Sequence, residues 1–201
     1  MEAKKIITIS REFGSGGRTI AKQLAERLNI PYYDKELVKK VAAETGFDQG
    51  FIEEHGELSS DKSGLSYIFK AQGTPGVMNG LSTSDFLWIM QRDVILQMAQ
   101  QGPCVIVGRC ADYILKERND CLNIFICADM KFRAERIVRL YGETDKKPEQ
   151  RLLEKDKKRR ANYKHYTEKE WGMSQNYHLC LNSGAIGIDR CADIIIDVLN
   201  G

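Results

Sequence analysis

The chain has 201 residues, of which 42% are apolar and 29% are charged, and its formal net charge is +2. This length suits one α/β domain with a buried core and a small inserted subdomain. The small net charge argues against a nucleic-acid binder driven by an overall basic field, and no apolar run is long enough to span a membrane.

The six cysteines form no CxxC pair, and no histidine stands at metal-ligand spacing from them. Cys104, Cys127 and Cys180 lie in or beside apolar strand-like runs, which predicts buried free thiols in a reducing compartment. There is no signal-peptide pattern at the N-terminus. Together these features predict a cytoplasmic protein with neither a membrane nor a nucleic acid as partner.

The first strong pattern in chain order covers residues 6–20: a β-branched strand, a glycine-rich turn and a helix that starts near Arg18. Three glycines in four residues let the backbone approach a ligand closely and adopt positive φ where needed. The helix offers free N–H groups and the positive end of its dipole, so the turn predicts an anion site, most often for phosphate. Arg18 adds a fixed positive charge, and Thr19 adds a hydroxyl that can bind Mg²⁺ directly or through water.

This turn is close to the phosphate-loop signature GxxxxGK[ST] but does not match it. When residues 17–19 take the GK[ST] place, Glu12 replaces the first glycine and Arg18 replaces the lysine. Arginine can neutralise phosphate, but it is bulkier than lysine and is not a compact point charge. The alternative interpretation is a glycine turn that joins a strand to a helix and binds no ligand.

The chain then alternates between helices and strands as far as Gly46. Apolar residues at 20, 24 and 28 form one helix face, residues 31–34 predict a short strand, and a second helix stops near Gly46. Asp34 has two interpretations, which are compatible. It caps the second helix, or it lies at the carboxyl end of a strand, where open α/β sheets bind ligands.

Residues 47–80 differ in character, because glycines are scattered among polar residues and the apolar periodicity is weak. We interpret this stretch as a mobile helical insertion of the kind that closes over substrate. The alternative is a long surface excursion without a function.

Regular elements resume after the insertion. A helix over residues 85–101 precedes a continuous apolar strand over 104–107, which suits a sheet covered on both faces. This strand ends at Gly108 and Arg109, so a guanidinium is expected at the rim of the sheet. The next expected elements are a helix over 111–117, a strand over 122–127 and a helix from Asp129 or Met130 to Gly142.

From Glu149 to about Tyr163 the chain is dominated by charge, and basic residues outnumber acidic ones over 155–164. Such a run is usually a solvated helix face. Beside a phosphate loop it also fits a mobile lid that brings arginines onto transferring phosphates. A last strand over 177–182 and a closing helix complete five strands separated by helices. Right-handed crossovers then predict a three-layer α/β/α sandwich with a five-stranded parallel sheet.

Four segments together resemble the cytidylate kinase-like family, a branch of the nucleoside monophosphate kinases within the P-loop NTPase fold. They are residues 10–18 (SREFGSGGR), 31–37 (PYYDKEL), 107–112 (VGRCAD) and 177–183 (YHLCLNS). The resemblance covers nearly the whole chain and implies a single kinase-like domain over 1–201. Its parts would be a CORE of residues 1–46, 81–142 and 165–201, a monophosphate-binding-like insertion at 47–80 and a LID-like segment at 143–164.

The resemblance also implies roles for individual residues. The expected cradle for the phosphates of ATP consists of Gly14, Ser15, Gly16, Gly17, Arg18 and Thr19. Within this cradle Thr19 is the expected contact to Mg²⁺, and Arg18 takes the electrostatic role of the lysine. Gly108 and Arg109 match two positions of the family's Gly-Arg-Asp sequence, while Cys110 stands in the place of the aspartate.

The segment Asp156-Lys157-Lys158-Arg159 matches the Asp-x-x-Arg pattern of the family's LID. This match makes Arg159 the preferred lid arginine, with Arg160 as its reserve. The expected catalytic residues are therefore Arg18, Arg109, Arg159 and Arg160. The expected substrate-binding residues are Asp34, Arg109, Arg133 and Arg136, the last two on the helix that precedes the LID.

The sequence therefore predicts ATP-dependent phosphoryl transfer with Mg²⁺ to a nucleoside monophosphate, with CMP or dCMP as the favoured acceptor, giving the diphosphate and ADP. Such transfer depends on positioning and charge stabilisation more than on general-base chemistry. Two alternatives stay open. One is a kinase for another small acceptor, since this fold hosts many substrates. The other is a non-catalytic nucleotide-binding regulatory protein, which the arginine in the lysine position favours.

Overall fold

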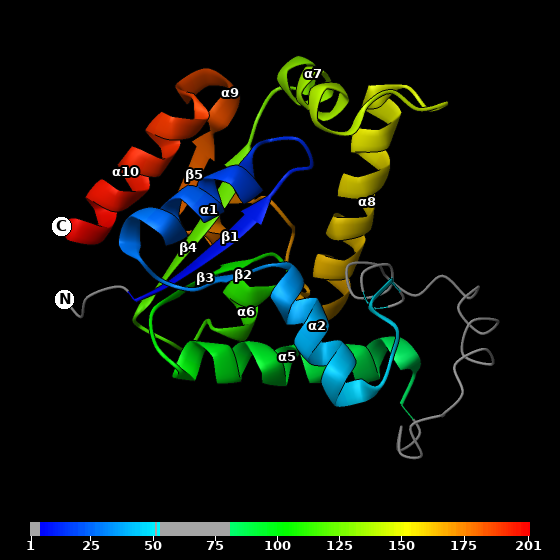
Figure 1. Ribbon diagram of the computed structural model, residues 1–201, viewed down its shortest axis with the longest axis vertical. Helices are drawn as coiled ribbons and strands as arrows, with labels where there is room; N and C mark the ends of the chain where they lie inside the picture. Colours follow the sequence, from blue (N-terminus) through cyan, green and yellow to red (C-terminus); the bar gives the residue numbers. More distant parts are fainter. Residues whose placement is uncertain (1–4, 51, 53–80) are drawn as a thin grey trace.

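The computed structural model describes residues 5–50, 52 and 81–201 (Figure 1). Five strands form one sheet in the order β2-β3-β1-β4-β5, and every neighbouring pair is parallel. The strands are β1 (Ile6–Arg11), β2 (Tyr32–Tyr33), β3 (Cys104–Val107), β4 (Cys121–Cys127) and β5 (Leu179–Asn182).

Helices lie on both faces of this sheet (Figure 1). One face packs against α1 (Gly17–Leu28) and α10 (Ile188–Asn200). The other packs against α2 (Lys35–Thr45), α5 (Thr83–Gln100) and α6 (Ala111–Ile114). The remaining helical elements are α7 (Met130–Tyr141), α8 (Pro148–Thr167), the 3₁₀ turn η2 (Ser174–Asn176) and α9 (Ser183–Ile186). The predicted three-layer α/β/α sandwich with a five-stranded parallel sheet is confirmed.

The buried core has two parts, one on each face of the sheet, because successive side chains along a strand point to opposite faces. Ile6 faces the α2–α5 layer, whereas Ile7 faces the α1–α10 layer, and both side chains are almost completely buried. In β3, Ile106 and Val105 divide in the same way. Because helices cover both faces, every position of these strands favours an apolar residue, which explains the continuous apolar runs in the sequence.

The sheet order places the glycine loop at the centre of one edge. β1 lies between β3 and β4, and the N–H of Gly108, just after β3, donates to the carbonyl of Ile9 at 3.0 Å. The glycine loop after β1 and the Gly108 turn after β3 therefore stand next to each other. This edge, at the carboxyl ends of parallel strands, is where open α/β sheets bind ligands.

Two helices lie beyond that edge. α7 and α8 pack together around Ala134, Ile137 and Leu152, and Phe13 of the glycine loop packs against the same cluster. In Figure 1 α8 runs alongside the carboxyl end of the sheet. The charged stretch that the sequence presents as a solvated face or a lid is thus a long helix docked on the loop.

Several element boundaries differ from expectation. α6 ends at Ile114 rather than at 117, α8 extends to Thr167, and β5 begins at Leu179 rather than at 177. Residues 51 and 53–80 hold most of the insertion expected at 47–80 and lie outside the described residues, so its role stays a prediction. No helix among the described residues is both long and apolar enough to cross a membrane.

The cysteines are all free, but they are not all buried as predicted. Cys104 is buried, Cys127 is half-buried and Cys180 is exposed. Cys180 lies on β5 at the border of the described sheet, which explains why an apolar strand pattern did not imply burial there.

Candidate active site

The glycine loop owes its shape to two left-handed residues, Gly14 and Gly16, with φ of 82° and 84°. Their surroundings also exclude a side chain. A Cβ at Gly14 would lie 2.9 Å from the carbonyl oxygen of Arg133, and one at Gly16 would lie 2.7 Å from Cδ1 of Ile188. Glycine is therefore required at both positions by backbone conformation and by packing.

The loop leads directly into α1, whose first residue is Gly17. The backbone N–H groups of Gly16 and Gly17 donate to no acceptor in the described part of the chain. Open N–H groups at a helix N-terminus, together with the helix dipole, attract an anion. This arrangement fits a phosphate group, as the sequence predicts.

Arg136 brings a buried cation to the same place. Its Nη2 donates to Oγ1 of Thr19 at 2.8 Å, and its side chain is 8% exposed. No carboxylate among the described residues forms an ion pair with it. Burial lowers the pKa of Arg136, and the neighbouring Arg139 lowers it further. An anion bound at the loop would stabilise the positive charge of this guanidinium and so offset the effects of burial and of Arg139.

Sequence reasoning missed Arg11, the last residue of β1. It is 5% exposed and passes between two distant glycines. A Cβ at Gly17 would lie 2.6 Å from Cβ of Arg11, and a Cβ at Gly108 would overlap its Nη1. The only sequence signals for this arrangement are the two glycines, and nothing in the sequence places them around one side chain.

Arg18, expected in the role of the lysine, is held by Asp34. Its Nε lies 2.8 Å from Oδ2, and its Nη2 donates to Oδ1 at 3.2 Å. Tyr32 also donates its hydroxyl to Oδ2 of Asp34 at 3.2 Å, and burial beside this carboxylate raises the pKa of Tyr32. Asp34 stands at the N-cap position of α2, but its side chain makes no capping hydrogen bond. The capping prediction was wrong because the carboxylate is engaged by Arg18 and Tyr32.

The turn after β3 is strained. Gly108, Arg109 and Cys110 have successive φ values of 74°, 57° and 54°. For a residue with a side chain, the left-handed conformation costs about 1–2 kcal/mol. The turn directs the buried side chain of Arg109 toward α5, where its Nη1 donates to Oε1 of Gln91 at 2.8 Å. The same Nη1 donates to the carbonyl of Ile52, outside α5, at 3.3 Å. Backbone strain that the fold maintains in this way is typical of functional sites.

α8 reaches the loop through Asp156 and Arg159. Oδ1 of Asp156 accepts the N–H of Phe13 at 2.8 Å, and its Oδ2 pairs with Nη1 of Arg133 at 2.5 Å. Nη1 of Arg159 donates to the carbonyl of Arg11 at 3.1 Å. Arg159 therefore lies at the loop, as predicted.

The structure does not bring two other expected residues to the loop in the same way. The guanidinium carbon of Arg160 lies 5.9 Å from the ring centroid of Trp171, and its charge lowers the pKa of Glu12 in the loop, which burial raises. Arg133 lies beside the loop, but its charge is already paired with Asp156, and its Nε is 3.5 Å from Oε2 of Glu12. These contacts favour a structural role for Arg133.

Two small pockets flank these groups. One, of about 60 Å³, lies against the glycine loop, and the other, of about 30 Å³, lies against Gly108, Arg109 and Asn162. Arg11 and Arg159 line both pockets. Both volumes are far below the roughly 300–1,000 Å³ typical of ligand sites, because α8 is docked on the loop.

The carboxylates near the loop are already engaged. Glu12 accepts the N–H of Ala128 at 3.1 Å, and burial raises its pKa; Asp34 and Asp156 pair with arginines. The hydroxyl of Thr19 accepts from Arg136. The described residues around the loop therefore do not form a cage for Mg²⁺, which in phosphate sites takes many of its ligands from the phosphates and from water.

The parallel sheet, the anion-binding loop and the ring of arginines define a kinase-type phosphotransferase of the P-loop class. The chain belongs to the cytidylate kinase-like family, whose family model matches residues 6–185.

Known proteins are similar to this chain in sequence or in fold. A cytidylate kinase from Pyrococcus horikoshii is 24% identical over 164 residues, which are 80% of this chain and 70% of that protein. Among solved structures, an uncharacterized protein from Eubacterium ventriosum is 29% identical with a TM-score of 0.73, covering 98% of this chain and 99% of the other. A shikimate kinase from Bacteroides thetaiotaomicron shares the fold at 14% identity, with a TM-score of 0.57 and 98% coverage of both chains.

Proposed function

We propose that this protein transfers the γ-phosphoryl group of ATP to a nucleoside monophosphate, with CMP or dCMP as the preferred acceptor. The observation that carries the proposal is the pair of adjoining pockets at one sheet edge. One has open N–H groups and Arg136, the other has Arg109, and Arg11 and Arg159 line both. Family membership and the name of the Pyrococcus horikoshii relative support the choice of acceptor.

The donor phosphates would bind at the N-terminus of α1. The N–H groups of Gly16 and Gly17 would donate to phosphate oxygens, and the guanidinium of Arg136 would supply the charge. Arg18 would contribute less, because Asp34 already neutralises much of its charge. Mg²⁺, when bound with ATP, neutralises phosphate charge; Thr19 is the proposed protein contact.

Arg11 and Arg159 would stabilise the group in transfer. Their presence in the walls of both pockets puts them between the proposed donor and acceptor positions. Charge stabilisation of this kind is the main contribution that a protein makes to phosphoryl transfer. Arg160 is the second candidate for the lid arginine and would contact the transferring group only after a movement of α8.

The acceptor would bind beside the turn after β3. Arg109 is the proposed contact to its phosphate, and Asp34 stands near the same edge of the sheet. A nucleotide is larger than either pocket, so α8 would have to move away from the loop before both substrates bind. The segment 143–164, which includes most of α8, is therefore the proposed LID.

Variants that affect ATP and CMP separately test this proposal. Replacing Arg136 by alanine should raise the KM for ATP by about ten- to a hundredfold, the value of one or two charge-assisted hydrogen bonds. Arg139→Ala is the matched control, because Arg139 is an exposed arginine on the same helix. Binding of ATP is measured by titration calorimetry, and KM values come from ADP formation.

Arg109→Ala should raise the KM for CMP and leave ATP binding largely intact. Arg109→Lys keeps a positive charge and should recover part of the loss if the side chain contacts phosphate. Normal CMP kinetics in the alanine variant would exclude Arg109 as an acceptor contact. Equal ATP affinity in the Arg136 and Arg139 variants would exclude Arg136 as a donor contact.

A further inference from the structure

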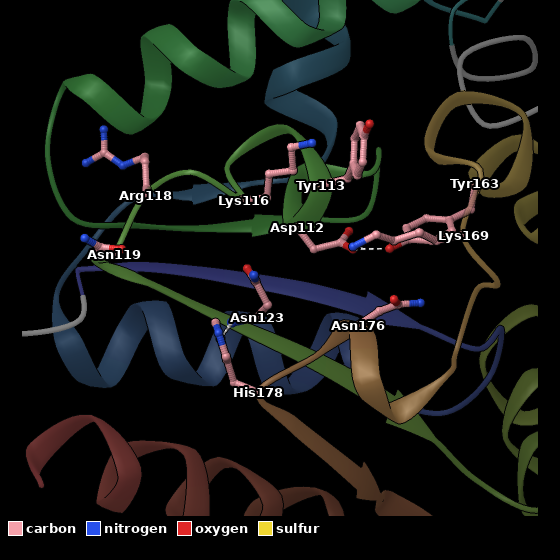
Figure 2. Close-up of a pocket in the computed structure, with 10 residues that line it drawn as sticks. All are labelled: Asp112, Tyr113, Lys116, Arg118, Asn119, Asn123, Tyr163, Lys169, Asn176 and His178. Atoms are coloured by element: carbon pink, nitrogen blue, oxygen red, sulfur yellow. Dashed lines mark hydrogen bonds between the residues drawn. The ribbon is translucent and has the colours of Figure 1, made fainter.

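A separate polar cleft of about 440 Å³ lies on the sheet face beside α6. In Figure 2 its lining side chains come from four places: α6 and the turn after it, β4, the end of α8, and the segment that follows α8. This volume is within the roughly 300–1,000 Å³ of small-molecule sites. None of its residues belongs to the glycine loop or to the turn that carries Arg109.

Asn123 of β4 provides a fixed donor at the floor of this cleft. It is 8% exposed, and its Oδ1 accepts the hydroxyl of Thr8 from the neighbouring strand at 2.7 Å. That bond fixes the amide, and its Nδ2 has no acceptor in the described part of the chain. An asparagine in a buried parallel strand is costly unless its polar atoms find partners. The N–H₂ group is therefore open to the cleft and available to a ligand there.

His178 stands beside Asn123. Its Nδ1 accepts the backbone N–H of Asn123 at 2.9 Å. A neutral imidazole with an accepting Nδ1 carries its proton on Nε2. Figure 2 shows the ring next to Asn123 at the same end of the cleft, where this hydrogen bond helps to hold the strand in place.

The charged groups around the cleft make it attractive to an anion. Lys116 and Lys169 both line it, and Nζ of Lys116 lies 4.4 Å from the ring centroid of Tyr113. Asp112, the one carboxyl group in the lining, already accepts the hydroxyl of Tyr163 at 2.7 Å and that of Ser10 at 3.4 Å. Burial raises the pKa of Asp112, which disfavours its negative charge. The positive charge of the lysines is therefore not cancelled by the one carboxyl group in this lining.

We propose that this cleft is a second ligand site, which binds a small metabolite that carries a carboxylate or a phosphate group. Nδ2 of Asn123 donates to the anion at the floor, and Lys169 pairs with its charge, joined by Lys116 once that side chain turns from the ring of Tyr113. The pair Asp112–Tyr163 forms the wall that separates this site from the pocket beside Arg109, since Tyr163 lines both. The site shares no residue with the glycine loop or with the turn that carries Arg109.

Nuclear magnetic resonance of the ¹⁵N-labelled protein tests the proposal residue by residue. Inorganic phosphate and malonate serve as the probes, so that the two anion chemistries are compared. We expect a saturable shift of the side-chain and backbone amide signals of Asn123 with at least one probe. The amides of Gly16 and Gly17 report phosphate binding at the glycine loop separately.

Paired variants identify the groups that bind. Replacing Lys116 and Lys169 together by alanine should weaken the Asn123 response about tenfold. Replacing Lys22 and Lys158, two exposed lysines outside the lining, should leave it unchanged. All four residues are exposed, so both variants are expected to fold. Shifts confined to the glycine loop, or equal affinity in the two double variants, would overturn the proposal.

Discussion

Arg18 and Asp34 form a two-point ion pair that joins the first turn of α1 to the start of α2. Nε of Arg18 lies 2.8 Å from Oδ2 of Asp34, and Nη2 donates to Oδ1 at 3.2 Å. The pair holds Arg18, which stands in the place of the phosphate-loop lysine, against Asp34 at the end of β2. Arg136 of α7 also reaches the loop, and it forms no ion pair with a carboxylate among the described residues.

The first prediction concerns the strength of this pair. Nearly half of the Arg18 side chain is exposed, so water and salt should screen the interaction. A double-mutant cycle with Arg18→Ala and Asp34→Ala should give a coupling energy of about 0.2–1 kcal/mol that falls as salt is added. The measurement is urea unfolding of the four proteins, with the exposed pair Arg27–Asp193 as control. A coupling energy well above this range, or one that ignores salt, would show that the pair is effectively buried.

Arg11 is the subject of the second prediction. We expect Arg11→Met to lower kcat by about 10²–10³-fold, which is the usual cost of removing one preorganised donor from a transition state. The Kd for ATP should change little, because the loop N–H groups and Arg136 are intact. Arg11→Lys should recover part of kcat. If both variants keep full kcat, Arg11 only fills the space between Gly17 and Gly108.

The third prediction compares a buried and an exposed carboxylate of α8. Asp156→Ala should lower the free energy of unfolding by about 3–5 kcal/mol, because it removes the nearer carboxylate from the buried Arg133 and leaves only Glu12, 3.5 Å away. Glu154→Ala is the control on the same helix, since Glu154 pairs with Lys146 at 2.8 Å in water-exposed surroundings. That change should cost no more than about 1 kcal/mol. Similar losses in both variants, measured by urea unfolding, would contradict the docking of α8 through Asp156.

Much of the fold and part of this site could be predicted from the sequence. Apolar runs predict β3 and β4, and the glycine turn predicts the loop between β1 and α1, because both are local patterns. The anion-binding role of that loop stays a prediction. Arg11 was missed because its position depends on glycines 91 residues apart in the chain, 17 and 108. The contact between Asp34 and Arg18 was missed for a related reason. A local capping rule does not include a competing cation from another element.

The fourth prediction is a pH dependence of stability. Burial raises the folded-state pKa of Asp112 above its unfolded value of about 3.9. Its stabilising contribution is therefore fully present below the unfolded pKa and is lost as pH rises through the folded pKa. Relative to Asp112→Asn, the native protein should lose stability as pH increases from about 4 toward neutrality.

A neighbouring carboxylate provides a control of opposite sign. Arg118 donates to Asp120 at 2.9 and 2.8 Å and lowers its pKa. The contribution of Asp120 is therefore present above the unfolded pKa and lost as pH falls through the folded pKa. Urea unfolding at a series of pH values should give opposite slopes for Asp112→Asn and Asp120→Asn, each compared with the native protein. Parallel slopes would contradict the protonation behaviour inferred for Asp112.

The most direct measurement of the proposed activity is ADP formation from ATP and Mg²⁺, with CMP, dCMP, UMP, AMP, GMP and no acceptor in parallel. The arrangement of two pockets joined by Arg11 and Arg159 predicts that CMP or dCMP raises ADP formation well above the rate without acceptor, with the matching diphosphate as product. If ATP binds but none of these monophosphates raises ADP formation, a nucleoside monophosphate kinase is contradicted. The protein would then act on a different small acceptor or bind nucleotide without turnover.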